Sequence, residues 1–473
     1  MSEEKAAQKT VRLSEMAGSS KSVLQARYDA AQTTDQNSRH WANAGMVGMT
    51  ADDRNNNQVR NILKSRSRYE YDNSGYVKRI INKTSREIVG KSIKVNVEST
   101  NKAFNTAVEK AIREWKRKIK LEAKLRTIAK DKIRDGEGVA LPIRNTALGD
   151  GVQLDLLPIT CDRITSTTLD SSANNVDGVL LNSMGIVNGF EIADRSDVQS
   201  TILNTETTKY SVDDVYFWYE QEYAEQHRGI PELTSTLQLN ADSRRYRKSV
   251  GDTAEMQTNF AMVLEQEVVN PDQTPCSAMD TIDLEPRTMT VLPPNAKLNS
   301  MQPGQPVDTY KEYTNTVLQE TSAPSIMPHN MVIGSSADMN YSSARFDYYI
   351  MFGKDRDILR EDMENEILND FIMRFILEWA ALNRRSIPRN MRVTFAYELD
   401  KYINPLQEAK ADKTRLEPME DGVRMQSLKS YHSLRGEDWQ EETDQCILED
   451  IYIKNQREKA GLTDTDTGGD TDE

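Results

Sequence analysis

The chain has 473 residues, of which 37% are hydrophobic and 28% charged, and its formal net charge is −14 at pH 7. This length suits about three domains of roughly 150 residues each, and the balance is typical of a globular protein. No apolar run reaches the ~20 residues that a membrane span needs, and no charged-then-apolar leader opens the chain. Cys161, Cys276 and Cys446 lie far apart, which argues against a zinc ribbon or a disulfide scaffold and favours a reducing cytoplasm.

Charge is distributed unevenly along the chain. Between Arg54 and Arg134 there are 23 Lys and Arg against 8 Asp and Glu, a local net charge of +15, so the remainder carries −29. Such segregation predicts two surfaces with different partners. The basic segment could bind nucleic acid, or its charges could pair with acidic faces within an oligomer; the sequence leaves both open.

The first half of the chain is predicted to contain helices and then short strands. Residues 52–134 read as helical, and 135–138 (DGEG) end this region with turn chemistry. Short strands separated by Gly, Asn and Asp turns follow: 152–157, 178–181 and 215–219.

The second half is predicted to be mainly helical. A long helix begins with Pro231 in its first turn and runs towards Glu267. A short helix at 309–320, an irregular loop at 323–343, an amphipathic helix, a strand at 392–397 and further helices from Pro405 past Cys446 complete it. The amphipathic helix places six apolar residues on one side: Leu359, Met363, Ile367, Phe371, Phe375 and Trp379. The acidic tail, 461–473, has almost nothing to bury and is expected to be disordered.

Catalytic and metal-binding motifs are not found. Residues 85–92 (SREIVGKS) differ from a phosphate-binding loop by Ser85 in place of the first glycine, so a helix ending at Gly90 is favoured. The four histidines are scattered, the carboxylates lack metal-ligand spacing, and there is no G-x-S-x-G. We therefore predict no enzyme, no cofactor and no metal.

The stretch Asn340-Tyr341-Ser342-Ser343-Ala344-Arg345 resembles the signature of the lambda-type portal family of tailed bacteriophages. Other stretches resemble that family in the same order: 177–180, 185–190, 227–233 (HRGIPEL), 309–334, 403–412 and 436–439. Asn404 and Gln407 depart from the aspartate and lysine that are usual in the fifth of these stretches. The resemblance covers about residues 54–453.

The resemblance implies an α+β, mainly helical, portal-like subunit with wing, stem, clip and crown regions. It implies a homo-oligomeric ring, typically a dodecamer, that conducts DNA at one capsid vertex during packaging and ejection, as a head–tail connector. The implied partners are further copies of the chain, double-stranded DNA, terminase, major capsid protein or scaffold, and neck or adaptor proteins, with no membrane. The implied location is the virion, and the host cytoplasm during assembly.

The same resemblance suggests how the chain is divided into regions. In chain order these are a flexible arm (1–51), a wing-like α/β region (52–228), a stem helix with a short clip (229–308), a channel helix and loop (309–345), a crown-like helical region (346–460) and a disordered acidic tail (461–473). No second stem helix is evident between Asn270 and Asp308.

The predicted channel loop has an uncharged tip, which suits a conduit because each neutralised phosphate would add affinity and friction. The tip candidates are Met327, His329, Asn330, Met331 and Val332. The signature from Asn340 to Arg345 is expected to anchor the loop's return, with Arg345 paired to a carboxylate. Alternatively, the signature is a packed helix start with Ser342 or Ser343 as N-cap.

Two other functions compete with the portal hypothesis. A nucleic-acid-binding protein would use the basic segment, residues 54–134, as a monomer or dimer. A packaging enzyme would turn over ATP at residues 85–92.

Overall fold

The computed structural model describes residues 49–166, 174–194, 207–259, 263–266, 296–299, 310–335, 340–397, 405–417, 424–428, 431–432 and 439–459. The chain divides into two units, Met1–Arg54 and Asn55–Glu473. In the first unit a short helix, α2 (Ala51–Arg54), begins with reciprocal hydrogen bonds between Thr50 and Asp53. The predicted arm otherwise lies outside the described residues, as do the tail at 461–473 and, of the predicted stem and clip region, residues 260–262, 267–295 and 300–308.

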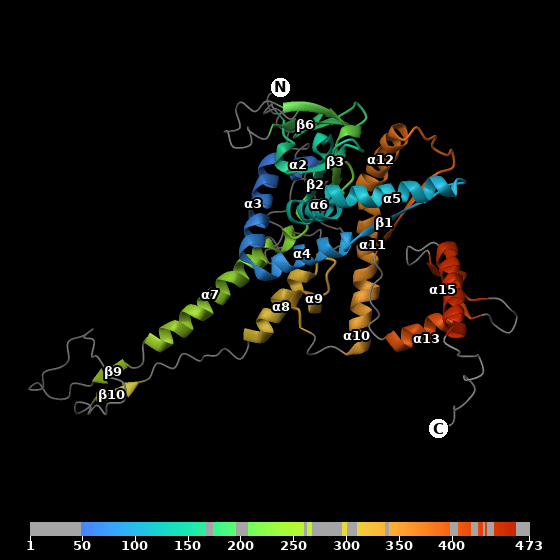
Figure 1. The fold of residues 1–473 in the computed structure, drawn as a ribbon. Coiled ribbons are helices and arrows are strands. Elements are labelled where there is room, and N and C mark those ends of the chain that lie inside the picture. The colour runs from blue at the N-terminus through green and yellow to red at the C-terminus, as the bar shows by residue number, and fades with distance from the viewer. Residues whose placement is uncertain are drawn as a thin grey trace, which may run out of the picture. The chain divides into compact units, whose positions relative to one another are not determined.

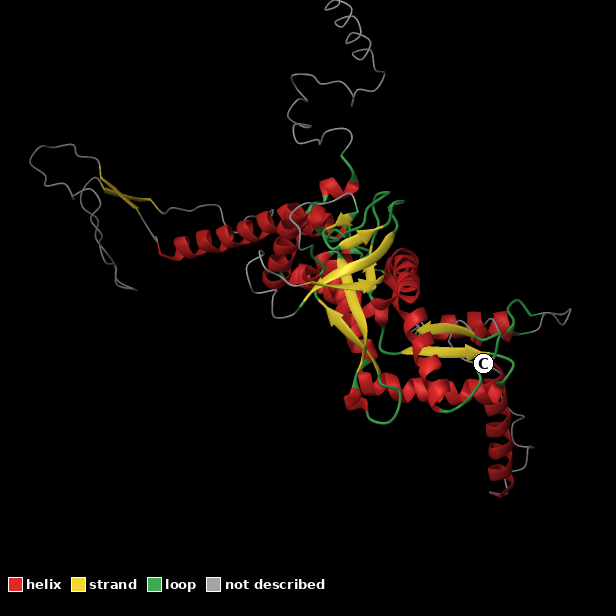
Figure 2. Cartoon of the chain, turned by 90° about the horizontal axis from the view of Figure 1, so that it is seen from above, coloured by secondary structure: helices red, strands yellow, loops and turns green. Residues whose placement is uncertain are grey.

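The second unit contains mostly helices and antiparallel strands (Figures 1 and 2). The helices of its first part are α3 (Asn57–Asn73), α4 (Gly75–Val89), α5 (Lys102–Ile119) and α6 (Leu121–Asp135). Those of its second part are α7 (Leu237–Asn259), α8 (Tyr310–Ser322), α9 (His329–Ile333), α10 (Tyr341–Arg345), α11 (Gly353–Met363), α12 (Asn369–Leu382), α13 (Pro405–Leu416) and α15 (Trp439–Lys459).

Within the described residues, the strands form four small antiparallel sheets. A four-stranded sheet has the order β4 (Asn175–Val176), β5 (Val179–Leu181), β6 (Val187–Ala193), β7 (Thr207–Ser211). A three-stranded sheet has the order β3 (Leu154–Ile159), β2 (Glu137–Arg144), β8 (Tyr216–Tyr219). Two strand pairs join β1 (Ile93–Glu98) to β11 (Arg392–Tyr397) and β9 (Val263–Gln266) to β10 (Ala296–Asn299).

The three-stranded sheet is covered on both faces. Along β8, Tyr216 and Trp218 belong to the main hydrophobic core with the helices, whereas Phe217 belongs to a second core with Val179 and Phe190 of the four-stranded sheet. Because successive side chains point to opposite faces of a strand, this sheet is the middle layer between helices and the smaller sheet. Burial on both faces explains why β8 is apolar without alternation.

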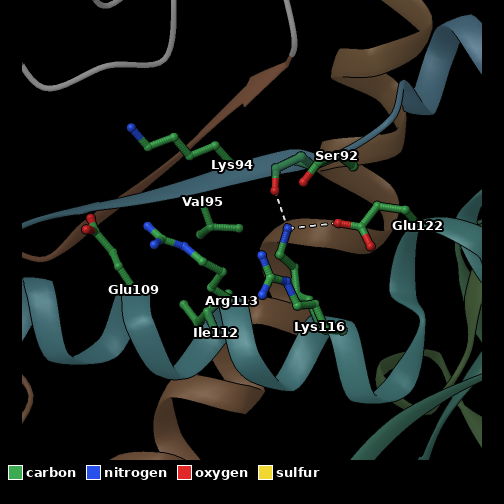
Figure 3. A pocket seen from close by; sticks show the side chains of 10 residues that line it. Ser92, Lys94, Val95, Glu109, Ile112, Arg113, Lys116 and Glu122 are labelled. Carbon is green, nitrogen blue, oxygen red and sulfur yellow. Dashed lines mark hydrogen bonds and ion pairs between the residues drawn. The ribbon is translucent and has the colours of Figure 1, made fainter.

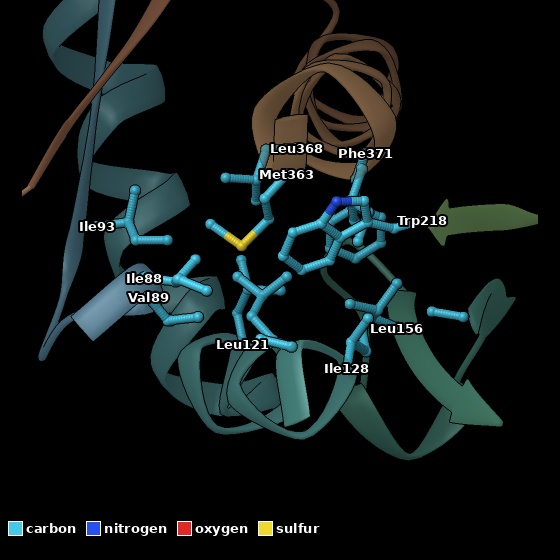
Figure 4. Packing of buried hydrophobic residues seen from close by; sticks show 14 of the residues in the cluster. Ile88, Val89, Ile93, Leu121, Ile128, Leu156, Trp218, Met363, Leu368 and Phe371 are labelled. Carbon is cyan, nitrogen blue, oxygen red and sulfur yellow. The ribbon is translucent and has the colours of Figure 1, made fainter. Parts of the chain in front are cut away.

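The main core brings together elements far apart in the sequence (Figure 4). Ile88 of α4, Leu121 and Ile128 of α6, Met363 of α11 and Phe371 of α12 converge in it. At its edge, Trp115 of α5 lies 4.3 Å from Phe375 and 5.2 Å from Phe371 between ring centroids, and its indole Nε1 donates to the carbonyl of Leu154. The helix predicted to be amphipathic therefore packs as expected.

That helix includes two π-helical segments. The backbone is helical from Tyr341 to Leu382, through α10, η7 (Phe346–Phe352), α11, η8 (Glu364–Leu368) and α12. A π-helical turn inserts one residue into the helical ladder and rotates the residues after it. The apolar side nevertheless stays in the core across η8, because Met363, Ile367 and Phe371 are all fully buried.

Three predicted elements differ from the structure, and one of them, the irregular loop predicted at 323–343, contains the helix α9. Residues 52–134 are interrupted by β1, whose buried Ile93, Val95 and Val97 alternate with polar residues and pair with β11, much later in the chain. The helix predicted to begin at Pro231 begins at Leu237, because Pro231 lies in a turn followed by a 3-10 segment, η6 (Thr234–Thr236). Among the described residues, no helix is both long enough and apolar enough to span a membrane.

Candidate functional site

A fully buried ion pair joins Arg228 to Glu137. Nε of Arg228 lies 2.6 Å from Oε1 of Glu137, and Nη2 donates to Oε2 at 2.8 Å, while both side chains are at most 1% exposed. The backbone N–H of Gly229 also donates to Oε1, at 2.9 Å. Burial by itself would raise the pKa of Glu137, but the charge and hydrogen bonds of Arg228 lower it below its ordinary value. Glu137 is therefore ionised in the folded protein.

This ion pair joins the two motifs around DGEG and HRGIPEL. Gly136 has a φ of +89°, and a Cβ there would lie 2.5 Å from the carbonyl carbon of Ile230. A Cβ on Gly229 would lie 2.1 Å from the carbonyl oxygen of Gly136. The two backbones thus touch at positions where only glycine fits. This backbone contact and the ion pair together fix the end of α6 against the segment that leads into α7.

Helix α3 adds a row of cations to the pair. Arg60, Lys64 and Arg68 recur every four residues and so share one face of the helix. Arg60 pairs with Asp177, Lys64 Nζ lies 2.6 Å from Asp162 Oδ1, and Arg68 makes two hydrogen bonds of 2.9 Å to Asp135. We call the whole group the ionic junction; its members are Arg60, Lys64, Arg68, Arg134, Asp135, Glu137, Asp162, Asp177 and Arg228.

The junction contains four bases of the basic segment: Arg60, Lys64, Arg68 and Arg134. Lys116 and Lys132 are also buried, and they pair with Glu122 at 2.9 Å and with Glu220 at 2.8 Å. Many of the bases between Arg54 and Arg134 are therefore matched by carboxylates of the same chain rather than facing solvent. The largest exposed group of bases lies on α5 and beside it: Lys94, Lys110, Arg113, Arg117, Lys118 and Lys120.

The predicted channel-loop candidates do not share one environment. Met327 and Val332 are at most 1% exposed and belong to the main core, so their side chains cannot face a channel. Residues His329–Ile333 form α9, and the carbonyl of Met331 accepts a 2.8 Å hydrogen bond from Arg79 of α4. Asn330 donates to Asp347 at 3.0 Å. His329, Asn330 and Met331 are partly exposed.

The signature at 340–345 is a helix start, as the alternative hypothesis held, but with a different cap. Asn340 is the N-cap of α10, and its side-chain oxygen accepts from the N–H of Ser343 at 2.8 Å. Ser342 and Ser343, which were predicted as caps, lie inside the helix and are exposed. Arg345 is exposed too, and within the described chain no carboxylate pairs with it.

The remaining candidates for chemistry have structural roles. Residue Ser85 is fully buried inside α4, which ends at Val89 with Gly90 as C-cap, as predicted, so residues 85–92 do not form a phosphate loop. Burial raises the pKa of the Cys161 thiol, which leaves it protonated and unreactive. In the described part of the chain, no group of three or more His, Cys, Asp or Glu side chains could hold a metal ion.

Comparison with known proteins identifies one family. The model of the family described as "Phage portal protein, lambda family" matches residues 37–349. No curated protein matches the chain. Similar solved structures include chains from "Neck of native GTA particle computed with C12 symmetry" (TM-score 0.49, 10% identity, 81% of this chain and 94% of that chain) and "Neck of empty GTA particle computed with C6 symmetry" (0.48, 11%, 79% and 93%). A third is from "Virion of native gene transfer agent (GTA) particle" (0.47, 11%, 85% and 99%).

Replacing Glu137 by Gln should destabilise the protein strongly. The substitution keeps the shape but leaves the buried Arg228 without its main counter-charge, which typically costs about 3–5 kcal/mol. Urea unfolding of wild type and variant measures the change. Glu87→Gln, which removes the partner of Lys83 in a partly exposed pair on α4, is the control and should cost less than about 1 kcal/mol. A similar small loss in Glu137→Gln would contradict the importance of the junction.

Asp162 should contribute stability that is lost in acid. Burial opposes its ionisation, but Lys64 and Arg68 lower its pKa to about 2. Its folded pKa is below the unfolded value of about 3.9, so its contribution is complete above about pH 4 and disappears as the pH falls towards 2. The difference in unfolding free energy between wild type and Asp162→Asn should shrink over that range. A difference that is constant from pH 7 to 2 would contradict this.

The contribution of Asp131 to stability should change with pH in the opposite direction, so this residue serves as the comparison. Burial raises its pKa to about 6, above the unfolded value, so its contribution is present below about pH 4 and is lost as the pH rises through 6. Titration of Asp131→Asn in the same urea experiments should show this opposite slope.

Proposed function

The chain belongs to the lambda family of phage portal proteins, and from this we propose that it closes into a homo-oligomeric ring, a dodecamer, which conducts double-stranded DNA. The ring would occupy one vertex of the capsid, serving packaging and ejection. Terminase, the major capsid protein or scaffold, and neck or adaptor proteins are the proposed partners, and assembly would take place in the host cytoplasm. The family match, which extends over residues 37–349, is the observation that carries this proposal.

The pair of helices α7 and α8 is proposed to be the stem. The rings of Tyr246 on α7 and Tyr313 on α8 lie 4.5 Å apart between centroids, and Thr321 donates to Asn240 at 3.3 Å. The chain thus leaves along α7 and returns along α8 (Figure 1). Helix α8, which the sequence assigned to the channel, would be the second stem helix that was not evident before Asp308.

The segment between the two stem helices is proposed to include the clip. Strands β9 and β10 pair in antiparallel register, from Val263 with Asn299 to Gln266 with Ala296. This pairing closes the ends of the intervening segment, 267–295. Beyond it, residues 52–228 remain the proposed wing and 346–460 the proposed crown.

A structural rather than catalytic role is proposed. Ser85 inside α4 and the capped end of that helix at Gly90 leave no backbone loop around a phosphate. DNA conduction needs weak contact with a polyanion, and the chain outside residues 54–134 carries −29. An acidic lumen would repel phosphates and let the duplex slide.

Ring formation is the direct test. Twelve copies of the 53.8 kDa chain have a mass of about 646 kDa. Native mass spectrometry and negative-stain imaging of the purified protein should show closed rings of about this size. A persistent monomer across salt and protein concentrations would contradict the proposal.

The channel-facing segment is proposed to be the partly exposed part of the helix α9, residues 329–331, a narrower set than the sequence suggested and not a loop. Asn330 is held to Asp347 of η7.

Asn330→Ala should change DNA retention without changing the ring. The substitution removes the hydrogen bond from Asn330 to Asp347, so that α9 is held less firmly, while no core side chain is altered. Packaged, nuclease-protected DNA per particle is the measurement. Met327→Ala is the contrasting variant: it truncates a core side chain and should cost about 2–5 kcal/mol of stability. Normal packaging by Asn330→Ala, with residues 329–331 located away from the ring axis, would disprove the channel-facing role.

A further inference from the structure

A pocket lies between strand β1 and helix α5, at the edge of β1 that β11 does not cover (Figure 3). Its lining combines apolar floor residues with bases and two carboxylates: Ser92, Ile93, Lys94, Val95, Glu109, Ile112, Arg113, Lys116, Arg117 and Glu122. Ile93, Val95 and Ile112 are buried. A ligand in the pocket would therefore contact mainly the charged side chains.

Side chains of α5 close most of the free edge of β1. Lys116 Nζ donates to the carbonyl of Ile93, and Glu109 Oε1 accepts from the N–H of Val97 at 2.7 Å. Backbone groups of alternate residues point to the same edge of a strand, so Val95 is the residue between these two caps. One open residue is too little for a partner strand, which needs several consecutive rungs. The pocket is therefore unsuited to strand addition.

The exposed face of α5 beside the pocket is strongly basic. Lys110, Arg113 and Arg117 follow each other at spacings of three and four residues, so they share one face of the helix. In the described part of the chain no carboxylate pairs with any of the three, although Glu114 is exposed near them. They span about 10 Å along the helix axis, and over that length a duplex carries about six phosphates.

The basic face itself lacks the anchors of a protein-docking site. Among the described residues of β1 and α5, no large hydrophobic side chain is exposed; the exposed Leu377 and Leu382 lie on α12, which packs against α5. Protein interfaces depend on aromatic or aliphatic anchors at their centre, and β1 and α5 offer none. Phosphate groups need only cations and hydrogen-bond donors.

We infer that the α5 surface, made of Lys94, Lys110, Arg113 and Arg117, binds the phosphate backbone of double-stranded DNA. The inference rests on the proposed portal function for the identity of the polyanion. Binding at this surface is independent of sequence and weakens steeply with salt, because each neutralised phosphate releases counterions. It differs from channel passage, in which tight contact would hinder movement.

The test measures binding of a fluorescent duplex of about 30 base pairs, a length that covers the surface several times over, to the full-length protein. Anisotropy is recorded at a series of salt concentrations. The variant is Lys110→Gln/Arg113→Gln/Arg117→Gln. The control, Lys354→Gln/Arg389→Gln/Lys410→Gln, removes the same charge from exposed bases elsewhere. Because the variant neutralises three fewer phosphates, its slope of log K against log salt, which is negative, should become shallower by about 2.7, and the control should match wild type.

Three outcomes would overturn the inference. Equal losses in variant and control would show that net charge alone matters, and unchanged binding in both would show that the surface is not used. Loss of rings in native mass spectrometry with DNA binding retained would identify the surface as a subunit contact instead. Because ring formation by wild type is measured separately, failure of the portal proposal is distinguishable from failure of this inference.

Discussion

The fold of the second unit depends on the buried ion pair between Glu137 and Arg228. A charge at this depth is tolerated only with a partner and hydrogen bonds, so the pair can form only when β2 and the segment before α7 meet. Gly136 and Gly229 allow this contact because their backbones lie so close that neither position has room for a side chain. Helix α3 then adds its three cations. One contact thereby orients α3, α6, the three-stranded sheet and the start of the proposed stem.

The same contact explains how the basic segment can belong to an acidic protein. Bases on the inner face of α3 and at Lys116 and Lys132 neutralise carboxylates of their own chain. In the described part of the chain, those on the outer face of α5 have no such partner. The bases of this segment thus divide into a structural group, which pairs with carboxylates and stabilises the fold, and a larger exposed group, part of which is available to a polyanion.

The proposed stem and channel-facing segment are supported from the same body. Arg244 of α7 pairs with Glu70 of α3 at 2.7 Å and lies over the ring of Tyr69. Arg79 of α4 holds the carbonyl of Met331, and Asn330 is held by Asp347. Helices α3 and α4 of the proposed wing therefore contact α7 and α9, and η7 of the proposed crown contacts α9 as well.

Local patterns in the sequence determined the element types well. Helical periodicity predicted the buried side of the long helix from Leu359 to Phe375, turn residues marked the short strands, and Gly90 marked the end of α4. The ordered family motifs, from HRGIPEL to the stretch at 340–345, predicted the family. Each motif is a short contiguous stretch, so its resemblance to the family can be read without knowing the tertiary structure.

Only the tertiary structure decided which partners these patterns meet. The strand β1 was missed although its β-branched residues alternate with polar ones, a local strand signal, whereas its partner β11, far along the chain, could be found only in the tertiary structure. Met327 and Val332 were predicted at a loop tip and are core residues, since nothing local distinguishes an apolar loop from a buried one. Periodicity likewise places Arg60, Lys64 and Arg68 on one helix face, but their carboxylates come from three distant segments. Whether a base is buried in a pair or exposed is settled by such long-range contacts.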